Sequence, residues 1–195
     1  MTVSQWGRVL VDEIERADVP SGELWIWPLG GPSLCVRSSK ATVYIDPFTG
    51  SPSSGPWLRL VAVPYDPSDL RQVNAVFSTH DHDDHCHEAT LRPIITNADA
   101  QLIGPASSVR KMVGFGFPEN RVTAAQDGDT WKFGDMTVRA AEILDHSDPT
   151  SLGYVVSVQN GPVFFDAGDS MYGAHFAKIC LLYTSPSPRD RTRSR

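Results

Sequence analysis

The sequence predicts a layered α/β fold, and three observations support this. The N-terminal stretch 5–17 carries apolar residues at helical spacing, which predicts a surface helix. Short β-rich runs separated by Gly, Pro, Ser and Lys follow it, which predicts an antiparallel meander. Helix-like and strand-like segments then alternate before two hairpin patterns, around Gly134-Asp135 and Asn160-Gly161. Together these patterns predict packed layers of sheet and helix.

The expected elements can be placed in chain order. The meander comprises strands at 24–27, 33–36 and 42–45, and the Pro-, Gly- and Ser-rich stretch 47–68 is expected to be a long loop. A buried strand is expected at 75–78, followed by helices at 88–97 and 106–113 around a strand at 101–103. The hairpins pair 130–133 with 136–143 and 152–158 with 163–165, and a last helix opens at Tyr172. We expect one domain over residues 1–179, with no internal repeat.

Composition restricts the class of protein. Hydrophobic residues make up 41% of the chain and aromatic residues 9%, enough to build a core. No run approaches the roughly 18 apolar residues of a membrane span, and the N-terminus lacks a basic segment followed by an apolar one. With only three scattered cysteines, Cys35, Cys86 and Cys180, the sequence favours a reducing, cytoplasmic location. The net charge of -6 opposes a nucleic-acid or anionic-membrane partner.

The run from His80 to His85 places three imidazoles and three carboxylates in six residues, directly after the expected strand. So many ionisable side chains are not buried without partners that neutralise or coordinate them. In an extended segment His80 and His82 lie on the same side and can converge on one cation, while Asp84 and His85 turn toward a second position. Imidazole together with carboxylate suits zinc, manganese or iron. The alternative is a solvated, His-rich surface loop.

Several segments resemble one known family. The pattern His80-x-His82-x-Asp84-His85 after a strand resembles the metal-binding motif of metallo-β-lactamase-fold hydrolases. Within that family the chain is similar to the L-ascorbate-6-phosphate lactonase group from about Trp6 to Lys178, on segments beyond the motif. These segments are Trp6-Gly7, Asp12 to Glu15, Leu70 to Val76, Ile103 to Pro105, Gly114 to Pro118 and Gly168 to Ser170.

The resemblance implies a four-layer αββα sandwich, here truncated within its C-terminal half, and a fuller site. Two divalent ions, Mn or Zn, would be held by His80, His82, Asp84, His85, His146 and Asp169. Asp169 would bridge the ions, with Asp166 as the competing carboxylate. Asp84 would also be catalytic, and Asp46 would support the motif from behind. His87, His175 and Cys86 have no ligand role in this interpretation.

The implied function is hydrolysis of a small, phosphorylated lactone or ester by a metal-activated hydroxide. A phosphodiesterase or nuclease of the same fold is one alternative. A truncated, inactive metal-binding fragment is another, with weak metal retention and poor solubility expected. The expected partner is a small-molecule substrate, with no nucleic acid and no membrane, and the full-length protein could form a homo-oligomer.

The C-terminal segment differs from the rest. Residues 180–195, beginning Cys180-Leu181-Leu182-Tyr183-Thr184-Ser185-Pro186, resemble the translation of a sequencing-library adaptor. The alternative is a genuine Ser-, Pro- and Arg-rich disordered tail. We expect a non-native tail. The natural protein is then expected to continue beyond Ile179 and to carry a further ligand histidine.

Overall fold

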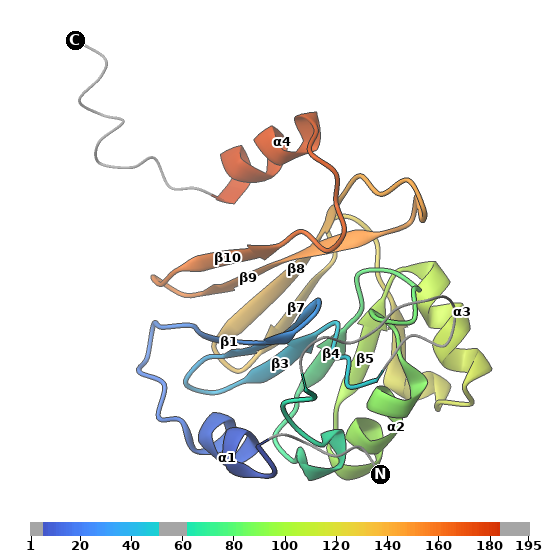
Figure 1. The fold of residues 1–195 in the computed structure, drawn as a ribbon. Coiled ribbons are helices and arrows are strands. Elements are labelled where there is room, and N and C mark those ends of the chain that lie inside the picture. The colour runs from blue at the N-terminus through green and yellow to red at the C-terminus, as the bar shows by residue number, and fades with distance from the viewer. Residues whose placement is uncertain (1–5, 51–61, 184–195) are drawn as a thin grey trace.

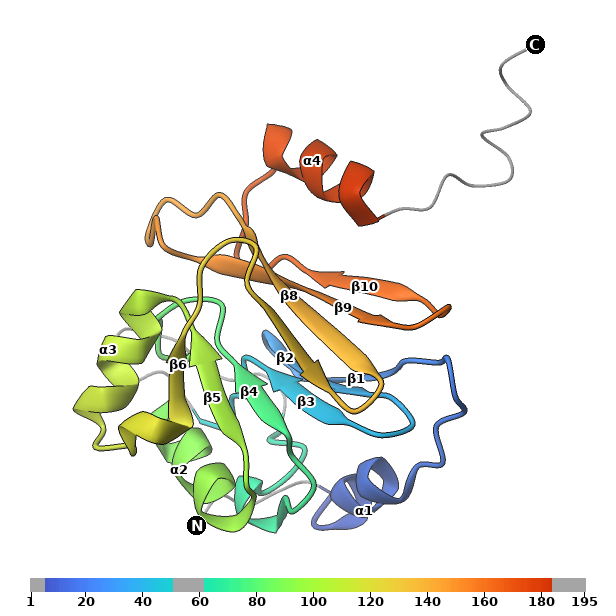
Figure 2. The ribbon, with the colours of Figure 1, turned by 180° about the vertical axis from the view of Figure 1, so that it is seen from behind.

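The computed structural model describes residues 6–50 and 62–183 and shows two β-sheets packed face to face (Figures 1 and 2). The first sheet has the strand order β1-β2-β3-β4-β5-β6. Its strands are β1 (Trp25–Gly30), β2 (Ser33–Arg37), β3 (Thr42–Ile45), β4 (Ala75–Phe77), β5 (Gln101–Gly104) and β6 (Val122–Ala124). The first three strands pair antiparallel, which confirms the predicted meander, and β3 to β6 pair parallel.

The second sheet is antiparallel, in the order β10-β9-β8-β7. Its strands are β7 (Thr130–Phe133), β8 (Met136–Glu142), β9 (Leu152–Val158) and β10 (Val163–Asp166). Both predicted hairpins are therefore confirmed. The prediction of a long loop at 47–68 lies partly outside the described residues, because 51–61 are not described.

Helices complete the layers on the outer faces of the two sheets. The α-helices are α1 (Val9–Arg16), α2 (Glu88–Asn97), α3 (Ala106–Gly114) and α4 (Ala174–Tyr183), and the 3₁₀ turns are η1 (Pro67–Asp69) and η2 (Glu119–Arg121). Helices α1, α2 and α3 contribute Ile14, Leu91 and Met112 to a core on one face of the first sheet. Ile179 of α4 packs with Val155 on the outer face of the second. The order helix, sheet, sheet, helix confirms the predicted αββα arrangement (Figure 2).

Strand alternation produces these layers. Val43 and Ile45 of β3 face the core between the sheets, where they join Phe77 and Tyr154. Tyr44, between them in sequence, faces the helices instead. Successive side chains of a strand point to opposite faces, so a buried strand with helices on one face and a sheet on the other is apolar throughout.

Two element boundaries differ from the prediction. The first helix starts at Val9, not near residue 5, because Gly7 has φ +54, in the left-handed region that a right-handed helix does not use. The last helix starts at Ala174 instead of Tyr172, after a turn in which Phe176 N–H donates to the carbonyl of Gly173. It runs to Tyr183, across the expected boundary at residue 179, and residues 184–195 are outside the described part. None of the helices in the described ranges has the length and apolar character needed to cross a bilayer.

The turn between β7 and β8 is tied to the first sheet by Asp135, which accepts hydrogen bonds from the hydroxyls of Ser38 and Ser39. Burial alone would raise the pKa of Asp135, but these hydrogen bonds lower it below its usual value. A carboxyl whose pKa is lower in the folded state stabilises the fold above its unfolded pKa of 3.8, and that contribution is lost as pH falls through the folded value. Asp135→Asn should therefore lower the unfolding free energy by about 1 kcal/mol at pH 7. Thermal unfolding should show that the difference in stability between the wild type and Asp135→Asn becomes smaller below pH 4. A stability difference that grows in acid would contradict this prediction.

Candidate metal centre

The predicted motif follows β4 as a tight loop at the carboxyl end of that strand. Ser78 N–H donates to the carbonyl of Ile103, which extends the parallel pairing, and Ser78 Oγ donates to the carbonyl of His85, which closes the loop. The second sheet binds the same segment, since Leu152 N–H donates to the carbonyl of Thr79 and Tyr154 Oη donates to that of Ser78. The loop thus begins where the two sheets meet, at the strand ends where open α/β sheets bind ligands.

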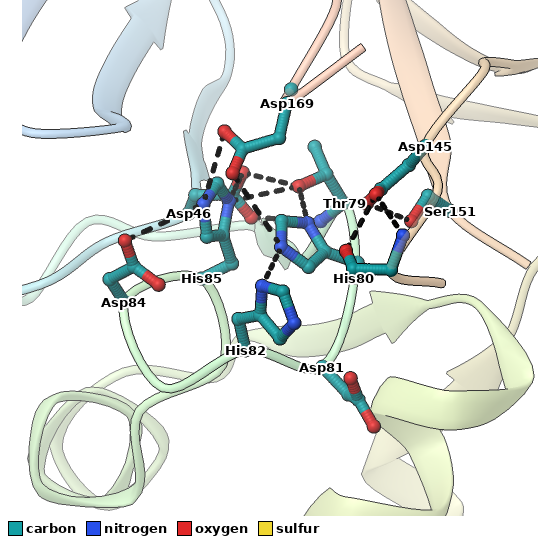
Figure 3. Close-up of polar contacts among 12 residues, drawn as sticks. Asp46, Thr79, His80, Asp81, His82, Asp84, His85, Asp145, Ser151 and Asp169 are labelled. Atoms are coloured by element: carbon teal, nitrogen blue, oxygen red, sulfur yellow. Dashed lines mark hydrogen bonds and ion pairs between the residues drawn. The ribbon is translucent and has the colours of Figure 1, made fainter. Parts of the chain in front are cut away.

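Three imidazoles gather in this loop (Figure 3). His80 and His85 are buried, with ring centroids 3.9 Å apart, whereas His82 is exposed. His80 Nε2 lies 2.9 Å from His82 Nδ1. Burial lowers the pKa of His80, and the neighbouring His85 lowers it further, which favours a neutral ring able to donate a lone pair to a cation.

Asp169 reaches the motif from the second sheet. It lies in the turn after β10, with Oδ2 3.9 Å from His80 Nε2 and Oδ1 3.4 Å from His85 Nε2. The turn depends on Gly168, whose φ is +50 and where an added Cβ would lie 3.0 Å from the Thr79 Cβ. Ligand atoms of His80, His82 and Asp169 lie within 4.8 Å of one another, close enough to share one metal ion. The predicted meeting of Asp169 with the histidines is therefore present in the structure.

Asp46 supports this group from behind, in a buried position after β3. Its Oδ1 accepts from Thr79 N–H at 2.8 Å, and its Oδ2 accepts from Thr79 Oγ1 and lies 2.7 Å from His85 Nδ1. Burial alone would lower the pKa of His85, but the charge of Asp46 and the contacts with Asp169 raise it to about 10. In the neutral ring, donation from Nδ1 to Asp46 leaves the Nε2 lone pair on the side of Asp169. This is the orienting contact that the sequence predicts for Asp46.

Asp84 lies on the side of the His85 ring that faces away from Asp46. Its carboxylate is 42% exposed, with Oδ2 3.8 Å from His85 Nε2. That nitrogen therefore faces both Asp84 and Asp169, the two predicted ligands that lie beside it (Figure 3). The exposed carboxylate is open to a substrate or a water molecule.

The structure does not bring His146 into the group of ligand atoms. His146 is exposed in the connection between β8 and β9, and its ligand role stays a prediction. The carboxylate of its neighbour Asp145 accepts hydrogen bonds from the hydroxyls of Ser147 and Ser151. Burial alone would raise the pKa of Asp145, but hydrogen bonds from Ser147 and Ser151 lower it to about 2.

Asp166, the competing carboxylate, makes a structural hydrogen bond in the turn after β10. Its Oδ1 accepts from Gly168 N–H at 2.8 Å and so shapes the turn that carries Asp169. Its Oδ2 is buried with no hydrogen-bond partner among the described residues. Burial, followed by the charge of Asp46, raises the pKa of Asp166 to about 6.

The residues present fit a divalent metal. Nitrogen atoms of His80 and His82 and an oxygen of Asp169 form a mixed imidazole and carboxylate set, the type that suits zinc, manganese or iron. The unpartnered oxygen of Asp166 adds buried negative potential beside it, which a cation would offset. Cys86 is not part of this set: it is buried, and burial raises the pKa of its thiol to about 12, which agrees with the absence of a ligand role.

Two supporting residues were missed in the sequence. Thr79 Oγ1 lies within 3.0 Å of both His80 Nδ1 and His85 Nδ1, and its position just before the first histidine could have suggested this. Lys111 of α3 donates to the carbonyl of Asp81 at 2.6 Å and to Asp83 Oδ1 at 2.7 Å, which holds the middle of the motif loop. No local pattern marks Lys111, because its contact depends on how α3 packs.

The fold and the site together define a four-layer α/β protein with a histidine and aspartate metal centre at its sheet edge. The sequence matches the family described as "Beta-lactamase superfamily domain" over residues 41–180, and the chain belongs to that family. The predicted family is thereby confirmed.

Known relatives and structures agree with this assignment. The chain is 27% identical to "Probable L-ascorbate-6-phosphate lactonase UlaG" of Escherichia coli strain E24377A, over 91% of this chain and 62% of the relative. The chain thus spans less than two thirds of that relative's length. Among solved structures, isothiocyanate hydrolase from Delia radicum gut bacteria has a TM-score of 0.65 at 20% identity, covering 83% of this chain and 68% of that one. CmlA, a diiron beta-hydroxylase from Streptomyces venezuelae, has a TM-score of 0.63 at 20% identity, covering 84% and 33%.

Proposed function

We propose that this chain carries the metal centre of a hydrolase that acts on a small lactone or ester, with a phosphorylated substrate. The observation that carries the proposal is the convergence of His80, His82 and Asp169 from two different sheets, next to Asp84 and His85. Divalent ions in such a site supply an activated water near neutral pH and polarise the substrate oxygen. We propose two ions, manganese or zinc: zinc binds such donor sets more tightly, and manganese is what the resemblance to the lactonases implies.

The side chains have separate tasks in this proposal. His80, His82, Asp84, His85 and Asp169 hold the ions, with His146 as a further proposed ligand. Asp46 keeps the ring of His85 oriented. Asp84, exposed beside His85, orients the attacking water, accepts its proton and passes that proton to the leaving oxygen. The product of a lactone is then the ring-opened hydroxy acid.

The choice of a lactone rests on the similarity to the lactonase relative. A phosphodiesterase reaction would use the same side chains, but the net charge of -6 disfavours a polyanionic nucleic acid. A small-molecule substrate and a cytoplasmic location belong to the same proposal. A third candidate is a metal-binding chain without catalysis.

Asp84→Asn should lower turnover by roughly 100- to 10,000-fold, the usual contribution of general acid–base catalysis. The assay would compare a phosphorylated lactone, an unphosphorylated lactone and a phosphodiester dye, with bound metal measured on the same samples. Asp81→Asn is the matched control, because Asp81 has the same side chain in the same loop but points away from the histidines (Figure 3). It should leave activity unchanged.

The outcomes separate the three candidates. Cleavage of the phosphorylated lactone supports the proposal, whereas cleavage of the dye alone would favour the phosphodiesterase. Bound metal with no turnover of any substrate would leave only the non-catalytic metal-binding chain. Equal turnover in Asp84→Asn and wild type would remove Asp84 from the mechanism.

A further inference from the structure

A second candidate site lies at the other end of the strands of the first sheet, away from the metal centre. A cavity of about 480 Å³ is lined by the turn between β2 and β3, by residues 71–74 before β4, and by Asp99. Thr42 is the first residue of β3 and Asn74 immediately precedes β4, whereas Asp46 and His80 follow the carboxyl ends of these strands. At about 3.3 Å per residue, β3 alone separates the two regions by on the order of 13 Å.

Three cationic side chains line this cavity, namely Arg37, Lys40 and Arg71. Within the described ranges none of them forms an ion pair with a carboxylate. Arg71 Nη1 donates only to the backbone carbonyls of Ser68 and Leu70. Within the described residues no direct ion pair therefore neutralises these three charges, in a chain whose net charge is -6.

Arg37 provides a second, independent observation. Its Nη1 donates to the carbonyl of Ile14, but its Nε is buried and has no hydrogen-bond partner among the described residues. A guanidinium that is solvated in the ordinary way does not leave a buried donor unpaired, since an unpaired buried donor is costly. Among the described residues the guanidinium is therefore paired with one backbone carbonyl only, and it lines the cavity with its charge uncompensated by any ion pair.

The acids near the cavity already have partners. Asp99 lies 3.4 Å from Arg121 Nη1 and is itself 99% exposed, and Glu15 Oε1 accepts from the backbone N–H groups of Arg71 and Gln72. Asn74 Oδ1 accepts from Thr42 N–H, which leaves the amide Nδ2 as a further donor. Donors thus outnumber free acceptors around the cavity.

We propose that this cavity binds a small oxyanion that carries two or more negative charges on phosphate or carboxylate groups. Guanidinium groups match both kinds of oxyanion, because their paired N–H donors fit two oxygens at once. The volume is in the range of small-molecule sites and well above that of a single ion. This site is separate from the metal centre and does not depend on the hydrolase proposal.

The test uses the 195-residue chain, stripped of metal with a chelator and then dialysed free of it, so that the metal centre does not bind the anion. Isothermal titration with pyrophosphate and with citrate should show one saturable site. Arg71→Gln combined with Lys40→Gln should weaken binding by roughly tenfold or more, the loss expected for charge-assisted hydrogen bonds. Arg110→Gln combined with Lys132→Gln is the control, since it removes the same charge from α3 and β7 and should leave the affinity unchanged.

Lys40→Gln alone guards against misfolding of the double variant, because Lys40 is exposed and makes no side-chain ion pair among the described residues. It should weaken binding in the same direction. Preference for pyrophosphate over citrate would identify a phosphate site, and the reverse preference a carboxylate site. Binding of neither anion, or equal weakening by the control pair, would overturn the proposal.

Discussion

His80→Ala should abolish measurable zinc or manganese binding. Removing a residue that only orients a ligand lowers metal affinity by up to roughly 100-fold, and removing this ligand itself should lower it further. His80 is the central ligand of the group: it is 0% exposed, with Nε2 2.9 Å from His82 Nδ1 and 3.9 Å from Asp169 Oδ2. Without its ring the ligand group loses its one buried member, and His82 and Asp169 remain as two exposed groups. Competition against a fluorescent zinc chelator would measure the change.

His87→Ala is the matched control for that experiment. His87 is also a histidine beside the motif, but its Nδ1 pairs with Thr90 Oγ1 and its ring packs edge-on against Phe48. Metal affinity should therefore be unchanged in this variant, although stability should fall from the lost packing. Equal zinc affinity of His80→Ala and wild type would show that the histidines form a packed core cluster, not a metal centre.

Much of the fold could be predicted because its strands and turns leave local patterns. The hairpin around Asn160-Gly161 was predictable from the turn residues, and Asn160 has the φ of 58 that such a turn favours. Strand β6 was missed, since Val122–Ala124 is short and partly exposed and exists through parallel pairing with β5. Strand preference of this kind depends on neighbours distant in sequence, which a local pattern does not contain.

The site residues also divide into those that a local sequence pattern reveals and those that only the packing of distant segments reveals. His80, His82, Asp84 and His85 could be recognised because they are adjacent in sequence, and the structure places all four at one strand end. The contacts of Lys111 with the motif loop could not, because they depend on how α3 packs against that loop. Asp46 and Asp169 lie between these cases: the resemblance to a family suggested their roles, and their contacts with His85 agree with those roles.

Asp46→Asn should weaken metal binding by about 10- to 100-fold, although Asp46 contributes no atom to the ligand group of His80, His82 and Asp169. The amide oxygen can still accept from Thr79 N–H, but the amide nitrogen replaces the oxygen that faces both Thr79 Oγ1 and His85 Nδ1. The amide N–H would then face the Nδ1–H of His85, a donor against a donor, so the ring of His85 loses the contact that fixes its Nε2. The same mismatch, buried among polar groups, should lower the unfolding free energy by about 2 kcal/mol.

Asp46→Asn isolates this electrostatic effect from the backbone. Asp46 has a φ of 46, a left-handed conformation that asparagine adopts as readily as aspartate, so the substitution adds no strain at that position. Thr79→Val should reproduce part of the loss by removing the hydroxyl that bridges Asp46 and the two histidines, whereas Thr79→Ser should retain it. Calorimetric unfolding and zinc competition should rank the variants Thr79→Ser, Thr79→Val and Asp46→Asn in order of increasing loss. If Thr79→Ser were as defective as Thr79→Val, the threonine methyl group and its packing, not the hydroxyl, would hold the site together.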